Sequence, residues 1–371
     1  MNSFSYYNPV RIRFGNGTIQ ELGRVPAGRS YLLVTTPGFV RRGTVAKIRS
    51  LAPQVTRVVA EISPNPDFRE LRAVYDSLDH DEFEMIVALG GGSVIDSAKV
   101  FSVWHEPASF DRVEELIRKK SSRRDYRLKP LVAVPTTAGT GSEVTPWATV
   151  WDGKEKKKYS LHLEDLWAES CICDPELTLS LPWELTWHTA LDALSHSLEA
   201  VWNRNANPVS TLLAVRAARE IINTLPGLAA EPENLEKRGR VMLAALQAGL
   251  AFSNTQTAVA HAVSYYLTAV KGIPHGPACS FLLPEIAEAV GGVDRRVDEA
   301  LAAVFGPAPG AALREFYARL GLDGVDYGLT NGDLKKIRES LGATGRAGNS
   351  LVPVDKLFAL WEKRLTGKLK S

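Results

Sequence analysis

Hydrophobic and polar positions follow two different periods along the chain, and the change falls near residue 182. Before that point, short β-branched and aliphatic runs alternate with segments whose apolar residues recur at helical spacing. The runs that we predict as buried strands are RSYLLVTT (29–36), TRVVAEI (56–62), EMIVALGGGS (84–93) and PLVAVPTT (130–137). The predicted helices among them are VRRGTVAKIRSLA (40–52) and DFRELRAVYDSLDHD (67–81). This alternation predicts a parallel sheet covered on both faces, with ligands bound beyond the carboxyl ends of the strands.

Beyond LPW (181–183), the strand pattern gives way to long Ala- and Leu-rich segments separated by Pro and Gly. We predict helices at 184–203, 208–224, 235–252, 255–270, 278–291, 296–304, 309–320, 331–341 and 353–365. The predicted fold is therefore a Rossmann-like α/β domain with a parallel sheet at 1–182, followed by an all-α domain at 183–371.

The composition narrows the classes of partner. The chain has 371 residues, of which 45% are hydrophobic, and its formal net charge is +2, so neither nucleic acid nor a membrane surface is an expected partner. No stretch reaches the roughly 18 apolar residues of a bilayer span, and no secretory signal precedes the domain, so we expect a cytoplasmic protein. The cysteines Cys171, Cys173 and Cys279 lie in apolar contexts and are expected to be packing residues, not a disulfide framework.

Two loops after predicted strands carry the features of a phosphate site. Gly90 to Gly92 end one strand, and Ser93 begins a helix whose amino-terminal N–H groups attract an anion. The alternative interpretation of the glycines alone is an ordinary tight turn between strand and helix. The second loop, VPTTAGTGSEVT (134–145), combines small hydroxyl residues with two glycines. Two such loops at neighbouring strand ends favour a dinucleotide.

A metal site is indicated by the helical part of the chain. Asp192 and His196 are four residues apart, so they lie on one face of a helix. As an isolated pair, they are more simply a hydrogen-bonded buried pair than a site. His261 lies in an apolar helix, where an unpaired imidazole is costly to bury, and His275 opens a segment after a turn. One carboxylate and three imidazoles together suit Zn²⁺ or Fe²⁺ and leave room for a substrate oxygen.

The motifs GGGSVIDSAK, PTTAGTGSE, DALSHSLEA and IPHGPAC stand in an order and at separations that resemble the iron-containing (group III) alcohol dehydrogenases over nearly the full length. The resemblance implies a dinucleotide-binding α/β domain, a helical domain and a site in the cleft between them. It implies that the metal, Fe²⁺ or Zn²⁺, is held by Asp192, His196, His261 and His275. It also implies NAD or NADP as cofactor and a homodimer or larger assembly. The cofactor residues that it implies are Gly91, Gly92, Ser93, Asp96, Thr136, Thr137 and Thr140, with Lys158 near the nicotinamide.

Two positions depart from the pattern of this family. Where the family often has a second histidine, proposed as a proton relay, this chain has Tyr265, so the proton must pass through Tyr265, a cofactor hydroxyl or water. Where many NAD-dependent members have an aspartate beside the adenosine ribose, this chain has Thr36, followed by Arg41 and Arg42. The missing carboxylate permits NADP without requiring it.

Within the family, the segments KKYSLHLEDLW, WNRNANPVS and AHAVSYYLT resemble the phosphonoacetaldehyde reductases. An aldehyde with a phosphonate tail needs a cationic partner, and we expect Arg204 first, then Lys158 or His162. The alternative for these residues is surface charge that packs the domain junction.

The expected activity is metal-dependent, NAD(P)H-linked reduction of a small aldehyde to a primary alcohol. Alternatives are a dehydrogenase for a sulfonate, carboxylate or neutral substrate, a lyase of the dehydroquinate synthase kind, and a catalytically silent metal-binding protein. The lyase would need a dense cluster of Lys and Arg to bind a sugar-phosphate acid. The helical half has no such cluster, which disfavours the lyase.

Overall fold

The computed structural model divides the chain into two compact units. It describes residues 3–119, 125–155, 157–322, 325, 327–341 and 345–368. One unit is Asn8–Leu181, and the other begins at Pro182 and also includes the residues before Asn8. Tyr6 Oη donates to Leu250 O (3.1 Å), and Tyr7 N–H donates to Asn254 Oδ1 (2.9 Å). Tyr6 and Tyr7 therefore pack with the helical unit, although the sequence analysis assigned them to the α/β domain.

The α/β unit is built on a six-stranded, all-parallel sheet in the order β1-β10-β7-β4-β2-β3. The strands are β1 (Arg11–Phe14), β2 (Tyr31–Val34), β3 (Val55–Val59), β4 (Met85–Gly90), β7 (Leu131–Pro135) and β10 (Ser170–Cys173). The four strands predicted from sequence are β2, β3, β4 and β7, and their parallel arrangement confirms the predicted fold class. The sequence analysis did not predict β1 and β10, because β1 is an edge strand whose apolar Ile12 is 39% exposed and β10 is a short run, SCIC, with one β-branched residue.

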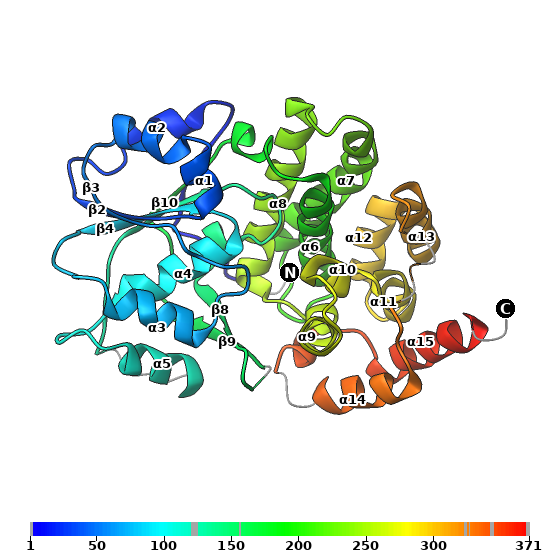
Figure 1. The fold of residues 1–371 in the computed structure, drawn as a ribbon. Helices are drawn as coiled ribbons and strands as arrows, with labels where there is room; N and C mark the ends of the chain where they lie inside the picture. The colour runs from blue at the N-terminus through cyan, green and yellow to red at the C-terminus, as the bar shows by residue number, and fades with distance from the viewer. Residues whose placement is uncertain are drawn as a thin grey trace. The chain divides into compact units, whose positions relative to one another are not determined.

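Helices cover both faces of this sheet, as Figure 1 shows. The α/β unit contains η1 (Thr18–Gly23), α1 (Pro37–Arg41), α2 (Thr44–Leu51), α3 (Phe68–Asp76), α4 (Gly92–Ser102), α5 (Phe110–Lys119), η2 (Ser142–Val144) and η3 (Pro175–Thr178). Alternate strand residues such as Leu33, Val87 and Val132 pack with Ile48 of α2 in one fully buried core cluster. The opposite face packs against α4, so the strands are apolar on both sides.

Two short antiparallel pairs extend the α/β unit. The first joins β5 (Val103–Trp104) to β6 (Arg127–Leu128), and the second joins β8 (Trp147–Asp152) to β9 (Lys157–His162). In the second pair, Lys158 lies directly opposite Trp151. The β8–β9 pair follows the second glycine-rich loop along the chain.

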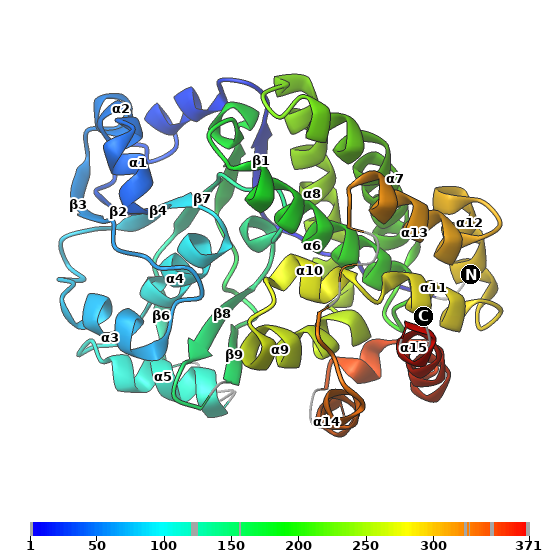
Figure 2. The same ribbon diagram turned by 45° about the vertical axis from the view of Figure 1, so that its right-hand side comes forward.

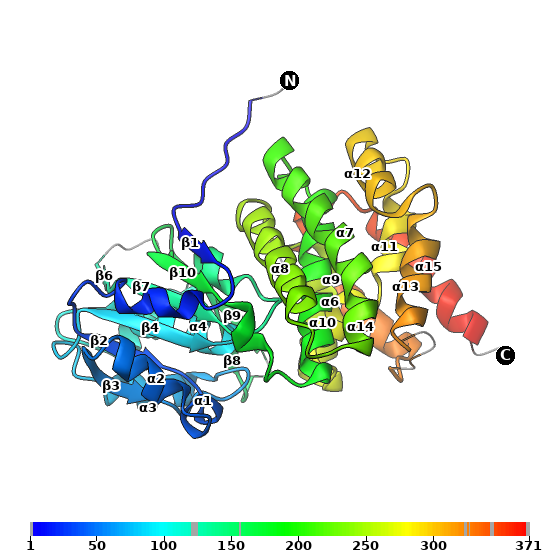
Figure 3. The same ribbon diagram turned by 90° about the horizontal axis from the view of Figure 1, so that it is seen from above.

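The other unit is helical throughout its described residues. Its elements are α6 (Trp183–Val201), α7 (Pro208–Ala230), α8 (Leu235–Thr255), α9 (Val259–Lys271), α10 (His275–Ser280), α11 (Leu283–Val290), α12 (Arg295–Phe305), α13 (Pro309–Arg319), α14 (Asn331–Leu341), η4 (Ala347–Asn349) and α15 (Val354–Lys368). Figures 2 and 3 both show α6, α7 and α8 side by side, and these helices make extensive mutual contacts. No helix in the described part of the chain is long and apolar enough to cross a bilayer.

One predicted helix is two in the structure. The segment predicted at 278–291 falls on α10 and α11, which are separated at Phe281 and Leu282. Pro284 stands in the first turn of α11, where its missing N–H costs nothing, whereas inside a continuous helix it would remove a hydrogen bond and clash with the preceding turn. The break leaves α10 as a short element that begins with His275.

Candidate metal and cofactor sites

Helix α6 carries an acid and an imidazole on one buried face. Asp192 and His196 are 4% and 5% exposed, and His196 Nε2 lies 3.8 Å from Asp192 Oδ1. The His196 ring is stacked against Phe252 of α8, at a centroid distance of 4.0 Å, which fixes its plane. The pair is therefore placed by packing on two sides and is not exposed to solvent.

Two further imidazoles reach the same carboxylate oxygen from other helices. His261 Nε2, from α9, lies 3.3 Å from Asp192 Oδ1, and His275 Nε2, from the first residue of α10, lies 3.8 Å from it. Helix α10 approaches α6 closely because residue 276 is glycine. A Cβ there would stand 1.8 Å from His188 O, so any side chain would push His275 away. The structure thus brings together all four residues that the sequence singled out as metal ligands.

A thiol belongs to the same cluster. One ligand atom each of Asp192, His261, His275 and Cys279 lie within 4.8 Å of one another, and Cys279 Sγ is 3.6 Å from the ring nitrogens of His275. This corrects the expectation that Cys279 is only a packing residue. Its spacing of four residues from His275 on α10 was a signal available in the sequence. Cys171 and Cys173 are buried in β10 and, like Cys279, form no disulfide.

The electrostatics of the cluster suit a cation. Burial alone would raise the pKa of Asp192, but the imidazoles of His196, His275 and His261 outweigh it and hold that pKa below its ordinary value. The group therefore stays a carboxylate although it is buried. Carboxylate oxygen, imidazole nitrogen and thiol sulfur are donors that Fe²⁺ and Zn²⁺ accept, so the residues present fit the metal that the motifs imply.

Glu199 orients the cluster, and the sequence analysis did not identify this residue. The side chain is fully buried and accepts hydrogen bonds from His261 Nδ1 (2.6 Å), Ala258 N–H (2.8 Å) and Ala260 N–H (2.5 Å). Because Nδ1 donates to Glu199, Nε2 is the His261 nitrogen that faces Asp192 and is left to bind a cation. Glu199 follows His196 by three residues, and that helical spacing was the available signal.

The two glycine-rich loops of the α/β unit pack against each other. They follow β4 and β7, which are neighbours in the sheet. A Cβ on Gly91 would stand 3.0 Å from Thr137, and one on Gly92 would stand 2.7 Å from Thr140. Thr136 N–H donates to Gly90 O (3.1 Å). The glycines therefore allow the threonines of the second loop to line the amino terminus of α4, where N–H groups are available to a phosphate.

The strand order places a topological switch between β2 and β4. From this neighbouring pair, the chain continues outward to β3 on one side and to β7 on the other, and such points bind nucleotides in doubly wound folds. Thr36 occupies the N-cap position of α1, just beyond β2, and its side chain makes no capping hydrogen bond; Thr35 Oγ1 donates to Leu89 O at the end of β4 (2.8 Å). Thr36 therefore lies at the carboxyl end of β2, the neighbour of the strand β4 that leads into the first glycine-rich loop. Arg41 and Arg42 are exposed, and the Arg42 guanidinium lies 4.5 Å from the Phe39 ring centroid.

Asp96 and Lys99 of α4 bind the second loop and the strand β8 that follows it. Asp96 Oδ2 accepts from Thr149 N–H (2.8 Å), whereas its buried Oδ1 has no hydrogen-bond partner within the described residues. Lys99 is fully buried, and its Nζ donates to the carbonyls of Ser142 (2.6 Å), Thr145 (2.7 Å) and Trp147 (2.8 Å). Burial lowers the pKa of Lys99 to about 8. Lys99 therefore anchors the second loop, a role that the sequence analysis did not identify. Asp96 Oδ1 offers an acceptor that fits a cofactor amide or hydroxyl.

The remaining predicted residues lie as follows. Ser93 Oγ, in the first turn of α4, accepts from Asn65 N–H (3.2 Å). Lys158 Nζ lies 5.7 Å from the Trp151 ring centroid. Tyr265 is half-buried on α9, one turn beyond His261. Arg204 Nε donates to Ser350 O (3.2 Å), so this guanidinium holds a chain segment.

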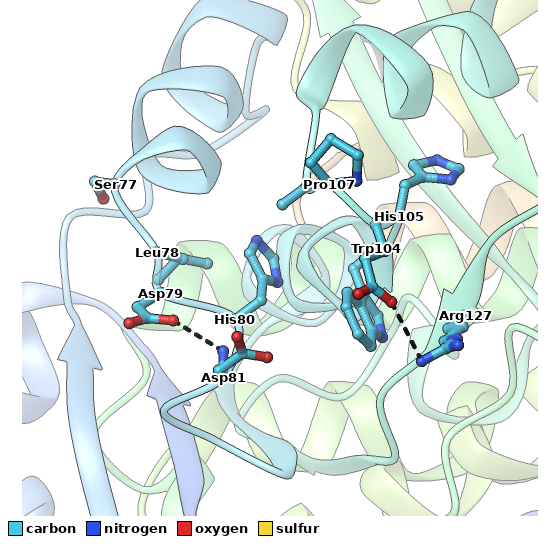
Figure 4. A pocket seen from close by; sticks show the side chains of 11 residues that line it. Ser77, Leu78, Asp79, His80, Asp81, Trp104, His105, Pro107 and Arg127 are labelled. Carbon is cyan, nitrogen blue, oxygen red and sulfur yellow. Dashed lines mark hydrogen bonds and ion pairs between the residues drawn. The ribbon is translucent and has the colours of Figure 1, made fainter.

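A separate recess of about 720 Å³ lies in the α/β unit and is lined mainly by the residues that follow α3 and α4 in the chain (Figure 4). Its side chains include His80 and His105, and Arg127 pairs there with Glu106 at 3.9 Å. These groups do not converge as metal ligands. Within the described residues, the cluster around Asp192 is the one group of three or more ligand-type side chains whose ligand atoms lie close together.

Comparisons with known proteins match both units. A family model described as iron-containing alcohol dehydrogenase matches residues 9–175, and one for the carboxyl-terminal part of that family matches residues 186–324. The chain is 33% identical over 297 residues to the 1,3-propanediol dehydrogenase of Citrobacter freundii, covering 76% of this chain and 74% of that protein. It is 33% identical to the choline dehydrogenase of Bacillus subtilis over 288 residues, covering 76% and 71%.

A solved structure extends the likeness to nearly the whole chain. The sulfoacetaldehyde reductase of Bifidobacterium kashiwanohense, in complex with NAD+, superposes with a TM-score of 0.89 at 30% identity and covers 98% of this chain and 99% of that one. With the ligand cluster and the paired loops in place, these matches show that the chain belongs to the iron-containing alcohol dehydrogenase family, whose cofactors are NAD(P) and iron, and that it is an alcohol/aldehyde oxidoreductase.

Proposed function

We propose that the protein reduces phosphonoacetaldehyde to 2-hydroxyethylphosphonate with NAD(P)H. The observation that carries the reductase assignment is the convergence of three imidazoles on the buried carboxylate of Asp192. The phosphonate tail rests on the resemblance of KKYSLHLEDLW, WNRNANPVS and AHAVSYYLT to phosphonoacetaldehyde reductases. It is supported by the 30% identity to a reductase whose substrate, sulfoacetaldehyde, also joins an aldehyde to an oxyanion.

The helical unit supplies the groups that act on the carbonyl. When bound, the metal acts as a Lewis acid that polarises the substrate carbonyl. Asp192, His196, His261 and His275 hold it, and Glu199 fixes the tautomer of His261. The product alcohol also requires a proton, and the Tyr265 hydroxyl is our candidate to pass it on.

The α/β unit supplies the residues that would bind NAD(P)H, the hydride donor. Gly91, Gly92 and Ser93 hold the pyrophosphate at the amino terminus of α4, and threonines of the second loop donate hydroxyl hydrogen bonds. Lys158 would lie toward the nicotinamide, and Asp96 would accept a hydrogen bond from the cofactor. Thr36 would lie at the adenosine ribose, where its neutral side chain would leave room for a 2′-phosphate and so permit NADPH as well as NADH.

Steady-state kinetics on three aldehydes test this proposal. We expect kcat/KM for phosphonoacetaldehyde to exceed that for propanal by about tenfold or more, because a charged hydrogen bond contributes roughly 1.5 to 3 kcal/mol. Sulfoacetaldehyde is the second candidate, favoured by the structural similarity, and it is measured in parallel. A higher kcat/KM for propanal would contradict the anionic substrate, and an absence of net NAD(P)H consumption would contradict the reductase.

A further inference from the structure

Resting on the proposed function, we infer that Arg346 binds the anionic tail of the substrate. A two-carbon aldehyde is short, so a cation that binds its tail must stand close to the residues that hold the metal. The Arg346 guanidinium lies beside Tyr265, one turn along α9 from His261. No sequence motif pointed to it, because it lies between α14 and α15 and far from the ligands along the chain.

The segment that carries Arg346 is fixed to the end of α6. Leu351 N–H donates to Trp202 O (3.0 Å), and Arg204 N–H donates to Asn349 O (2.7 Å). Arg204 Nε adds a third contact, to Ser350 O (3.2 Å). Helix α6 carries Asp192 and His196. The segment is therefore positioned by the helix that supplies two ligands.

The same segment is fixed to the start of α9. Asn349 Nδ2 donates to Thr257 O (3.0 Å), and Arg346 Nη1 donates to Thr257 Oγ1 (3.0 Å). Thr257 stands four residues before His261. The Arg346 guanidinium carbon lies 5.8 Å from the ring centroid of Tyr265, which follows His261 by four residues on α9. Side chains at this spacing share one helix face, with Cβ atoms roughly 5 to 6 Å apart.

The charge of Arg346 is available to a ligand. The side chain is half-buried, and within the described residues it forms no ion pair with a carboxylate. Its hydrogen bond to Thr257 engages one of the five N–H donors of a guanidinium. A half-buried guanidinium with donors to spare suits a tetrahedral oxyanion, which it can bind in bidentate fashion.

Arg204, which the sequence favoured for this role, has a different task. Its backbone N–H and its Nε both bind the segment that follows Arg346. Arg204 therefore positions the segment, and Arg346 presents the cation. The ligand class is a small aldehyde that carries a phosphonate or a sulfonate.

Binding and turnover of Arg346→Gln test the inference. We expect kcat/KM for phosphonoacetaldehyde to fall about 10- to 100-fold, mainly through KM, while kcat/KM for propanal changes less than about threefold. Methylphosphonate, used as a competitive inhibitor of propanal reduction, should lose affinity by a similar factor. Arg346→Lys should restore part of both losses, because it returns the charge without the bidentate geometry. The same series with sulfoacetaldehyde distinguishes phosphonate from sulfonate as the preferred tail.

Two control variants separate binding from folding. Thr257→Val removes the hydrogen-bond acceptor of Arg346 but keeps the positive charge. If Arg346 were only structural, Thr257→Val and Arg346→Gln would both lower kcat/KM equally for phosphonoacetaldehyde and propanal. Arg295→Gln changes an exposed arginine of α12 and should alter neither substrate. Equal losses on phosphonoacetaldehyde and propanal, or no loss of methylphosphonate affinity in Arg346→Gln, would overturn the inference.

The two proposals fail separately. If wild-type enzyme prefers propanal, the proposed substrate is wrong, and methylphosphonate inhibition then decides the inference: inhibition that depends on Arg346 supports an anion subsite, and its absence overturns it. If wild-type enzyme prefers phosphonoacetaldehyde but Arg346→Gln keeps that preference, the proposed function stands and the inference is wrong.

Discussion

The cluster of ligand-type side chains in the helical unit and the paired glycine-rich loops of the α/β unit are built by opposite means. The cluster depends on which side chains are present: Asp192, its imidazoles and Glu199 all act through specific atoms. The loops depend on where side chains are absent, because a Cβ on Gly91 or Gly92 would collide with the facing threonines. Substitutions that remove atoms should therefore damage the cluster, and substitutions that add atoms should damage the loops.

The largest expected effect is the loss of a ligand. His261→Ala should lower kcat at least about 1000-fold, because the Lewis-acid contribution of several kcal/mol is lost with the metal. Metal content by elemental analysis should fall, while NADH binding, followed by fluorescence, stays within a few-fold of wild type. His80→Gln, a buried histidine of the α/β unit, is the control. Full activity with retained metal in His261→Ala would remove His261 from the ligand set.

A smaller effect is expected at the residue that orients a ligand. Glu199→Gln keeps the shape of the side chain but removes the negative charge that His261 Nδ1 donates to. Metal affinity, measured by competition with a chelator, should fall about 10- to 100-fold. Excess metal should restore most of kcat, which distinguishes this variant from His261→Ala. Glu299→Gln, on the surface of α12, should leave affinity unchanged.

The loops should respond to an added methyl group. Gly92→Ala places a Cβ 2.7 Å from Thr140 Cγ2, so one loop must shift away from the phosphate. We expect KM for NAD(P)H to rise about 10- to 100-fold, as small displacements of binding groups do, with metal content unchanged. Gly153→Ala is the matched control, because its Cβ meets only Asp67 Oδ2 at 3.5 Å. An equal KM in both variants would contradict the assignment of this loop.

The smallest effect concerns cofactor choice. Thr36→Asp puts a carboxylate where we propose the adenosine ribose, and it should repel a 2′-phosphate. The ratio of kcat/KM for NADPH to that for NADH should fall about tenfold, the size of one charged interaction. Ser50→Asp adds the same charge on α2 and should leave the ratio as it is. An unchanged ratio in Thr36→Asp would show that Thr36 does not contact the ribose.

The sequence by itself determined the fold class, the strands at β2, β3, β4 and β7 and the positions of the long helices, because apolar spacing records which face of a long element is buried. It also singled out Asp192, His196, His261 and His275 as candidate ligands, since ligand chemistry is a property of residue type, and the structure brings them together. It did not determine β1, an edge strand whose register is set by its pairing with β10.

Tertiary structure decided the contacts between residues distant in sequence. The distance from Glu199 to His261, the approach of Cys279 to the cluster and the anchoring of the second loop by Lys99 all depend on how helices and strands pack. Arg346 follows His261 by 85 residues, and only the hydrogen bonds to Thr257 and the end of α6 bring its segment beside the ligand helices. Local spacing encodes which residues share a face of one element, whereas a site built from several elements exists only after they have packed together.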